Sequence, residues 1–148
     1  MLRLVLRTQP RSGRAGGSDN NTMRIQELNH VAIHVKDVEK SCRFYREVLC
    51  LESIPRPAFT FPGAWFRLGT QQELHLIGDR GDPVFSHNRG NHFALQVDDL
   101  DAWEQHFRSV GAEHLLRKQR PDGASQLFLR DPDDHVIELF TPPKANAV

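Results

Sequence analysis

The sequence predicts an α+β protein made of two tandem βαβββ modules, whose strands form a curved mixed sheet around a cleft. The first observation behind this prediction is an internal repeat, in which residues 29–35 return as residues 91–97 with Asn, His, Ala and Val at matching positions. Periodic self-similarity is the signature of a structural unit used more than once. The second observation is that each copy is followed by an aspartate, a helical run and three short strand-like segments. Together they indicate one folding unit that occurs twice.

The first module opens with a strand over residues 28–35, because apolar side chains there alternate with His and Ala. Asp37 follows and favours a helix N-cap. Apolar residues then recur at intervals of four and three, which predicts a helix over 38–49. Prolines keep 55–63 a loop. The remaining strands of this module are therefore expected at residues 51–54, 65–68 and 73–77.

The second module repeats this order. A strand over 91–97 leads to Asp99, and a helix over 100–110 ends at Gly111, a residue type that favours helix C-termini. Short segments with strand patterns follow, separated by loops that contain Pro, Gly and Asp. These strands are expected at residues 113–117, 126–129 and 135–140.

The repeat also sets the expected domain limits. Residues 23–144 form one domain, a size that supports a proper hydrophobic core, with modules at about 24–78 and 90–142. Residues 1–22 are rich in Arg and Gly, and we expect a disordered N-terminal extension there. Such an extension is either a targeting segment or an overextended start before Met23.

Composition limits the classes of function. Lysine plus arginine equal aspartate plus glutamate at 19 each, so no basic surplus points to nucleic acid. No apolar run approaches the length of a membrane span, so we expect no membrane partner. Cys42 and Cys50 lie around one predicted helix and do not suggest a disulfide framework. This cysteine usage favours a reducing compartment, and we expect a cytoplasmic protein.

Four side chains at matching positions of the repeat are the candidate metal ligands. His30 matches His92 at an offset of 62, and His75 matches Glu138 at an offset of 63, with the extra residue absorbed in a loop. Two modules related by a pseudo-twofold axis would bring the four strands that carry these residues around one metal cleft. Three imidazoles and one carboxylate suit a divalent transition metal with positions left for water or substrate. We therefore expect one divalent metal ion per site, either Ni, Zn, Mn, Co or Fe.

Four segments of the chain resemble the vicinal oxygen chelate superfamily, which includes glyoxalase I, the fosfomycin-modifying thiol transferases, methylmalonyl-CoA epimerase and the extradiol dioxygenases. Residues 28–33 are similar to the opening strand of that superfamily, which carries its first ligand, and residues 41–51 to its first helix. Residues 91–94 are similar to the first strand of its second module, and residues 131–139 to its closing turn and last ligand strand. The resemblance covers about residues 24–142.

The resemblance implies a small-molecule substrate and a metal-dependent lyase or isomerase of the glyoxalase I type. In such an enzyme the metal holds two neighbouring oxygens of the substrate, and Glu138 is expected to act as the general base. His34 shares the strand face of His30 and is expected to contact the substrate.

Two alternatives follow from the same resemblance. Glyoxalase I enzymes usually carry Glu at the position of His75. Without His75, the remaining ligands match the two-His, one-carboxylate pattern of a thiol transferase or a non-haem iron extradiol dioxygenase. The second alternative is a ligand-sequestering protein that keeps the fold and has no catalytic activity.

The resemblance also implies an assembly. Relatives of this size commonly form dimers in which each site draws ligands from both chains. We therefore expect a homodimer with two sites. In each site, His30 and His75 would come from one chain, and His92 and Glu138 from the other.

Overall fold

The structure is a computed structural model that describes residues 23–144, so the extension expected over residues 1–22 lies outside the described part. The first module has the expected order βαβββ. Its elements are β1 (His30–His34), α1 (Val38–Glu47), β2 (Ser53–Ile54), β3 (Gly63–Leu68) and β4 (Gln72–Ile77).

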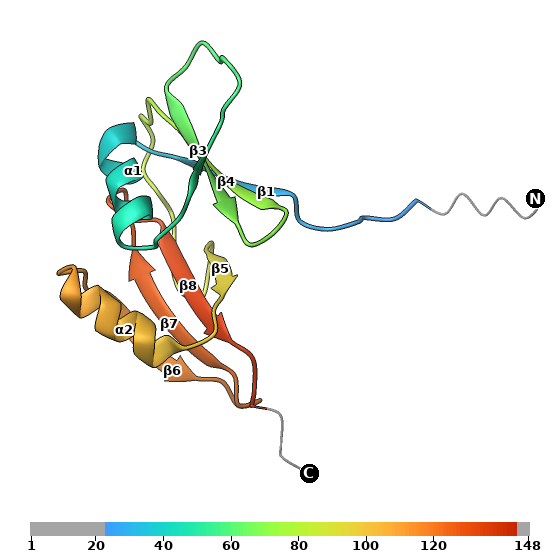
Figure 1. The fold of residues 1–148 in the computed structure, drawn as a ribbon, viewed down its shortest axis with the longest axis vertical. Coiled ribbons are helices and arrows are strands. Elements are labelled where there is room, and N and C mark those ends of the chain that lie inside the picture. Colours follow the sequence, from blue (N-terminus) through green and yellow to red (C-terminus); the bar gives the residue numbers. More distant parts are fainter. Residues whose placement is uncertain (1–22, 145–148) are drawn as a thin grey trace, which may run out of the picture.

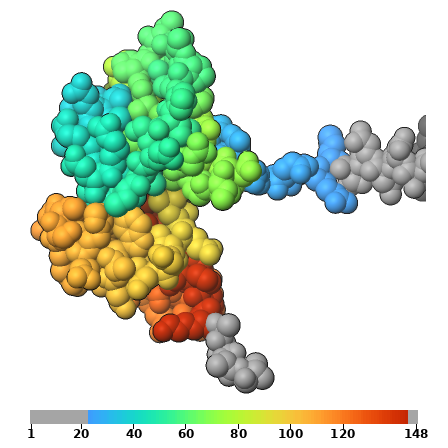
Figure 2. Space-filling view, viewed as in Figure 1, coloured from blue at the N-terminus to red at the C-terminus, as the bar shows by residue number. Residues whose placement is uncertain are grey.

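The second module has the same order, and its ribbon lies below the first module in Figure 1. Its elements are β5 (Phe93–Gln96), α2 (Leu100–Ser109), β6 (His114–Gln119), β7 (Ser125–Arg130) and β8 (Val136–Thr141). The expected α+β class and the tandem βαβββ order are confirmed. A space-filling view shows the two modules as two lobes (Figure 2).

Each module forms its own four-stranded mixed sheet, in the orders β1-β4-β3-β2 and β5-β8-β7-β6. The first strand of each sheet runs parallel to the last strand of that module. Ala32 lies opposite His75 in the first sheet, and Ala94 lies opposite Glu138 in the second. The two registers therefore place His75 and Glu138 at equivalent positions, as the sequence repeat predicts.

Helix caps and core packing explain how the helices are placed. The Asp37 side chain accepts a hydrogen bond from the N–H of Lys40 at the start of α1, which satisfies a free donor of the first turn. On α1, Tyr45 is fully buried and its ring lies 5.9 Å from that of Phe66 in β3. On α2, Phe107 is buried in the same continuous core. Neither helix of residues 23–144 is long and apolar enough to cross a membrane.

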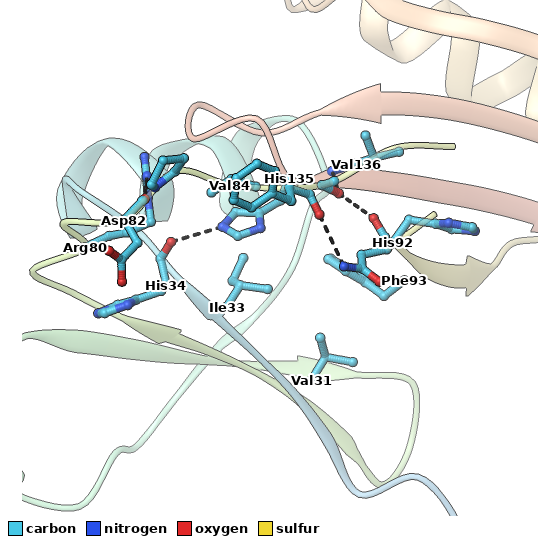
Figure 3. Close-up of a pocket in the computed structure, with 14 residues that line it drawn as sticks. Val31, Ile33, His34, Arg80, Asp82, Val84, His92, Phe93, His135 and Val136 are labelled. Atoms are coloured by element: carbon cyan, nitrogen blue, oxygen red, sulfur yellow. Dashed lines mark hydrogen bonds between the residues drawn. The ribbon is translucent and has the colours of Figure 1, made fainter. Parts of the chain in front are cut away.

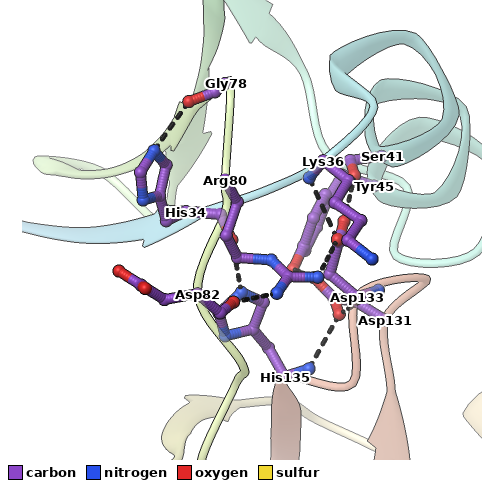
Figure 4. A network of polar contacts seen from close by, with 10 residues as sticks. All are labelled: His34, Lys36, Ser41, Tyr45, Gly78, Arg80, Asp82, Asp131, Asp133 and His135. Atoms are coloured by element: carbon purple, nitrogen blue, oxygen red, sulfur yellow. Dashed lines mark hydrogen bonds and ion pairs between the residues drawn. The ribbon is translucent and has the colours of Figure 1, made fainter.

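A buried polar network joins the turn between β7 and β8 to the first module (Figure 4). The Tyr45 hydroxyl donates to Oδ2 of Asp131 at 2.8 Å, and Arg80 forms an ion pair with Asp133 at 2.8 Å. Ser41 of α1 donates a further hydrogen bond to Asp133. These contacts cross between segments far apart in the chain, so they hold the second module against α1.

The pKa values of the acidic groups in this network shift in different directions because their hydrogen-bond partners differ. Burial raises the pKa of the Tyr45 hydroxyl and of the Asp131 carboxyl. Burial also acts to raise the pKa of Asp133, but hydrogen bonds from Arg80 and from the N–H of Lys36 outweigh it and hold that pKa below its ordinary value. Asp133 is therefore the member whose negative charge the fold stabilises.

Candidate metal centre

Strand alternation places the predicted ligands of the first module on the sheet face that points away from the core. In β1, Ile33 is buried in the core and His30 is exposed. In β4, Leu74 and Leu76 are buried, and His75 between them points to the opposite face. His30 and His75 are thus neighbours on one surface of the first sheet.

The two histidines of the first module are stacked on each other. Their ring centroids lie 4.4 Å apart with an interplanar angle of 14°. Nδ1 of His30 lies 2.9 Å from Oδ1 of Asn29, which leaves Nε2 free. Nε2 of His75 lies 2.7 Å from Oε2 of Glu73. The same nitrogen is therefore available in His30 and engaged in His75.

The ligands of the second module are in direct contact. Nε2 of His92 lies 3.0 Å from Oε2 of Glu138, and Nδ1 of His92 lies 3.0 Å from the carbonyl oxygen of Gly90. The amide of Gln126 donates to the other carboxylate oxygen of Glu138 at 2.6 Å. Glu138 and Gln126 are both buried, so this carboxylate is held in one orientation.

The donor set of the second module fits a divalent metal. The Gly90 carbonyl accepts a hydrogen bond from Nδ1–H of His92, which leaves a lone pair on Nε2 facing the carboxylate of Glu138. Two lone-pair atoms at this separation need a cation or a proton between them. Two donor atoms on one octahedral ion lie about 3.0 Å apart, and an ordinary hydrogen bond has about the same length, so the observed spacing of 3.0 Å accommodates either a metal ion or a proton.

The four predicted ligands form two pairs rather than one cluster. Within residues 23–144, no three His, Cys, Asp or Glu side chains converge to form a metal site. His30 and His75 make one pair in the first module, and His92 and Glu138 make the other in the second. One chain therefore presents two half-sets of ligands.

Two further polar residues support the ligands, and sequence reasoning did not assign them this role. Glu73 had the pattern of a charge at the rim, but its carboxylate accepts a hydrogen bond from His75. Gln126 orients Glu138. A shared strand face was a signal for Glu73, which lies two residues before His75, whereas Gln126 lies on a neighbouring strand and gave no local signal.

Aromatic residues flank both pairs at repeat-equivalent positions. Trp65 lies opposite His75, and their rings stack with centroids 4.0 Å apart and an interplanar angle of 6°. Phe128 lies opposite Glu138, and its ring is 5.8 Å from that of His92. The sequence alone left open whether Trp65 and Phe128 face the cleft, and the strand register answers this.

His34 lies in a separate pocket of about 360 Å³ (Figure 3). Its Nε2–H donates to the carbonyl oxygen of Gly78 at 2.7 Å, and its own carbonyl oxygen accepts from Nε2–H of His135 at 3.0 Å. His92 and Arg80 also line this pocket. The substrate contact expected of His34 remains a prediction, and the pocket is the space where it would occur.

Comparison with known proteins identifies the family of the chain. A family model described as the Glyoxalase/Bleomycin resistance protein/Dioxygenase superfamily matches residues 27–139. The chain is similar to Glyoxylase I 4 of Arabidopsis thaliana, with 28% identity over 127 residues that cover 80% of this chain and 72% of the relative. It is also similar to metallothiol transferase FosB of Staphylococcus saprophyticus, with 26% identity over 122 residues that cover 79% of this chain and 78% of the relative.

Solved structures share the fold. A glyoxalase family protein from Bacillus anthracis superposes with a TM-score of 0.70 and 27% identity, covering 81% of this chain and 98% of that one. A variant of the fosfomycin resistance protein FosX from Listeria monocytogenes, in complex with Mn(II) and 1S,2S-dihydroxypropylphosphonic acid, superposes with a TM-score of 0.68 and 20% identity, covering 82% of this chain and 95% of that one. Because the family model spans most of its length, the chain belongs to the Glyoxalase/Bleomycin resistance protein/Dioxygenase superfamily.

Proposed function

We propose that the protein is a divalent-metal-dependent lyase or isomerase of the glyoxalase I type. The observation that carries this proposal is the His92–Glu138 pair, whose facing lone pairs lie 3.0 Å apart on a rigid strand frame. The superfamily consists mostly of metal-dependent enzymes, and one similar protein is Glyoxylase I 4 of Arabidopsis thaliana. His30 and His75 would complete the ligand set.

Different residues of the chain would then have separate roles in the reaction. A bound divalent ion would supply Lewis acidity toward two neighbouring oxygens of a small substrate. Oε2 of Glu138 is the oxygen that would either hold the ion or, when it is not bound to the ion, accept a proton from the substrate, because Gln126 occupies Oε1. Gly90 keeps His92 in the tautomer that presents Nε2 to the cleft.

A thiol transferase is the second candidate, and one observation favours it. Glu73 already engages Nε2 of His75, which weakens His75 as a ligand through that nitrogen. His30, His92 and Glu138 then form the two-His, one-carboxylate pattern, and metallothiol transferases are among the similar proteins.

The second half of each site would come from a second chain. Within the described residues, β1 pairs with β4 and β5 pairs with β8, and each leaves its other edge unpaired. An apolar groove of about 860 Å³ lies along these two edges and is lined by Val31, Leu49, Leu68, Phe93 and Leu95 among others. A homodimer would cover both edges and bring complementary ligand pairs together.

Metal analysis and an activity screen test the proposal. We expect one divalent ion per chain and a steep loss of metal affinity in His92→Ala, because the removed imidazole leaves the coordination shell incomplete. His34→Ala is the matched control, since it removes an exposed strand histidine outside the ligand set. The metal-loaded protein is expected to isomerise hemithioacetals.

Each alternative has its own signature in the same screen. Thiol addition to an epoxide would favour the transferase, and oxygen consumption with a catechol would favour the dioxygenase. A protein that takes up none of Ni, Zn, Mn, Co or Fe would contradict both the proposed function and the transferase.

A further inference from the structure

A row of neighbouring rings, three of whose four contacts are stacked and one tilted, connects an exposed loop to the candidate metal ligands. The loop is the segment 55–62 between β2 and β3. Successive ring centroids along the row lie 5.1, 6.1, 4.0 and 4.4 Å apart. In order, the rings belong to Phe61, Phe59, Trp65, His75 and His30.

The outer rings of this row are accessible to solvent yet held in place. Phe59 is 45% exposed and Phe61 is 39% exposed. The guanidinium carbon of Arg56 lies 4.7 Å from the ring centroid of Phe59 and 4.9 Å from that of Phe61. Arg56 also donates to the carbonyl oxygen of Phe61 at 2.9 Å, which ties the loop together. Large aromatic side chains gathered on a surface mark a binding site more often than isolated ones do.

The second module lacks this surface, although it is built from the same unit. Its residue equivalent to Trp65 is Phe128, which is fully buried and has the ammonium of Lys118 5.0 Å from its ring centroid. The matching loop, residues 120–124 between β6 and β7, contains no aromatic residue. The exposed rings are therefore an addition to the first module and not a consequence of the repeat.

We propose that Phe59, Phe61 and Trp65, here called the aromatic row, bind a planar aromatic group of the substrate. This inference rests on the proposed function, since it places the substrate's two neighbouring oxygens beside His75 and its ring along the aromatic row. Trp65 contacts His75 directly, so a ring bound beside Trp65 lies close to the candidate metal ligands. Offset or edge-to-face stacking stabilises such a ring beyond the burial of its area.

Two hydroxamates that differ in one group provide the test. Benzohydroxamate and acetohydroxamate both chelate a metal through two neighbouring oxygens, but the first carries a phenyl ring and the second a methyl group. We expect zinc-loaded protein to bind benzohydroxamate at least about tenfold more tightly, as measured by calorimetry. Phe59→Ala and Phe61→Ala, both on the exposed loop, should remove this preference and leave acetohydroxamate affinity unchanged, because these rings contact each other and Trp65 rather than a candidate ligand. Leu115→Ala, which removes another exposed apolar side chain, on β6, is the control.

The outcomes separate the inference from the proposed function. Equal affinities for the two hydroxamates in zinc-loaded protein would overturn the aromatic site and leave the metal function standing. Absence of uptake of all five ions, Ni, Zn, Mn, Co and Fe, would overturn the metal function, and NMR of the metal-free protein then tests the aromatic site. If benzohydroxamate but not acetohydroxamate shifts the NMR resonance of the Trp65 indole N–H, the aromatic site is supported. If benzohydroxamate causes no shift, the aromatic site is overturned. A change of oligomeric state in Phe59→Ala would also overturn it, by assigning the rings to a contact between chains.

Discussion

At the scale of single residues, the amide of Gln126 controls how Glu138 presents its carboxylate. The amide nitrogen lies 2.6 Å from Oε1, and both side chains are buried, so water does not replace this donor easily. The contact leaves Oε2 facing His92 at 3.0 Å. One hydrogen bond thus distinguishes the oxygen that Gln126 holds from the oxygen that faces His92.

Replacing Gln126 by Leu is expected to weaken zinc binding about ten- to a hundredfold, which is the usual effect of removing a group that orients a metal ligand. The affinity is measured by competition with a chromogenic chelator. Gln119→Leu serves as the control, because Gln119 lies on an exposed strand and bonds to the carbonyl of Gly123. Equal zinc affinity in the two variants would contradict the role given to Gln126.

Residue types at repeat positions predicted the ligands, but only one of the two residues that support them had a local signal. His30 and His92 recur at one offset, so the sequence alone places them on matching strands. Glu73 shares a strand face with His75 two residues away, whereas Gln126 became visible only when β7 was paired with β8. Their roles depend on side-chain direction, which a single sequence does not encode locally.

At the scale of elements, the buried ion pair between Arg80 and Asp133 holds the β7–β8 turn against the segment that follows β4. Asp133→Asn is expected to lower the free energy of unfolding by about 3 kcal/mol at pH 7, because it leaves a buried guanidinium without its counter-charge. Urea unfolding measures this loss. Asp134→Asn, in the same turn but exposed, should have little effect.

The loss of stability in Asp133→Asn is expected to depend on pH, and the pKa of Asp133 gives the sign of this dependence. The pKa of Asp133 is lower in the folded state than in the unfolded chain. Its contribution to stability is therefore full above the unfolded value of about 3.9 and is lost as the pH falls through the lower folded value. The difference in free energy of unfolding between wild type and Asp133→Asn should accordingly become smaller at acid pH. A difference that stays constant from pH 7 to pH 3 would contradict the assignment.

Element order was predictable because each element has a local period, whereas the contacts between modules were not. Asp37 and Asp99 cap both helices as their positions predict. The observed strand and helix limits differ from the expected ones by a few residues, which is usual at frayed ends. The contact of Tyr45 with Asp131 joins residues 86 positions apart, and no periodicity in the sequence points to it.

At the scale of the whole molecule, the unpaired edges of β1 and β5 and the apolar groove beside them favour a dimer. Leu28 lines this groove and is 66% exposed in the single chain, so a charge there costs the chain's own fold little. We expect Leu28→Asp to shift the protein toward monomer in size-exclusion chromatography with light scattering. Leu115→Asp, on the edge strand β6 and 52% exposed, is the control. An unchanged dimer in Leu28→Asp would argue against this interface.

In the proposed dimer, each metal site combines His30 and His75 of one chain with His92 and Glu138 of the other. Mixing His30→Ala protein with Glu138→Ala protein, under conditions where native mass spectrometry demonstrates subunit exchange, tests it most directly. A mixed dimer would contain one site with both substitutions and one site with neither. We therefore predict one bound metal ion per mixed dimer, measured on the same spectra, while each variant alone binds poorly. Mixed dimers that form and bind no metal would contradict a shared site.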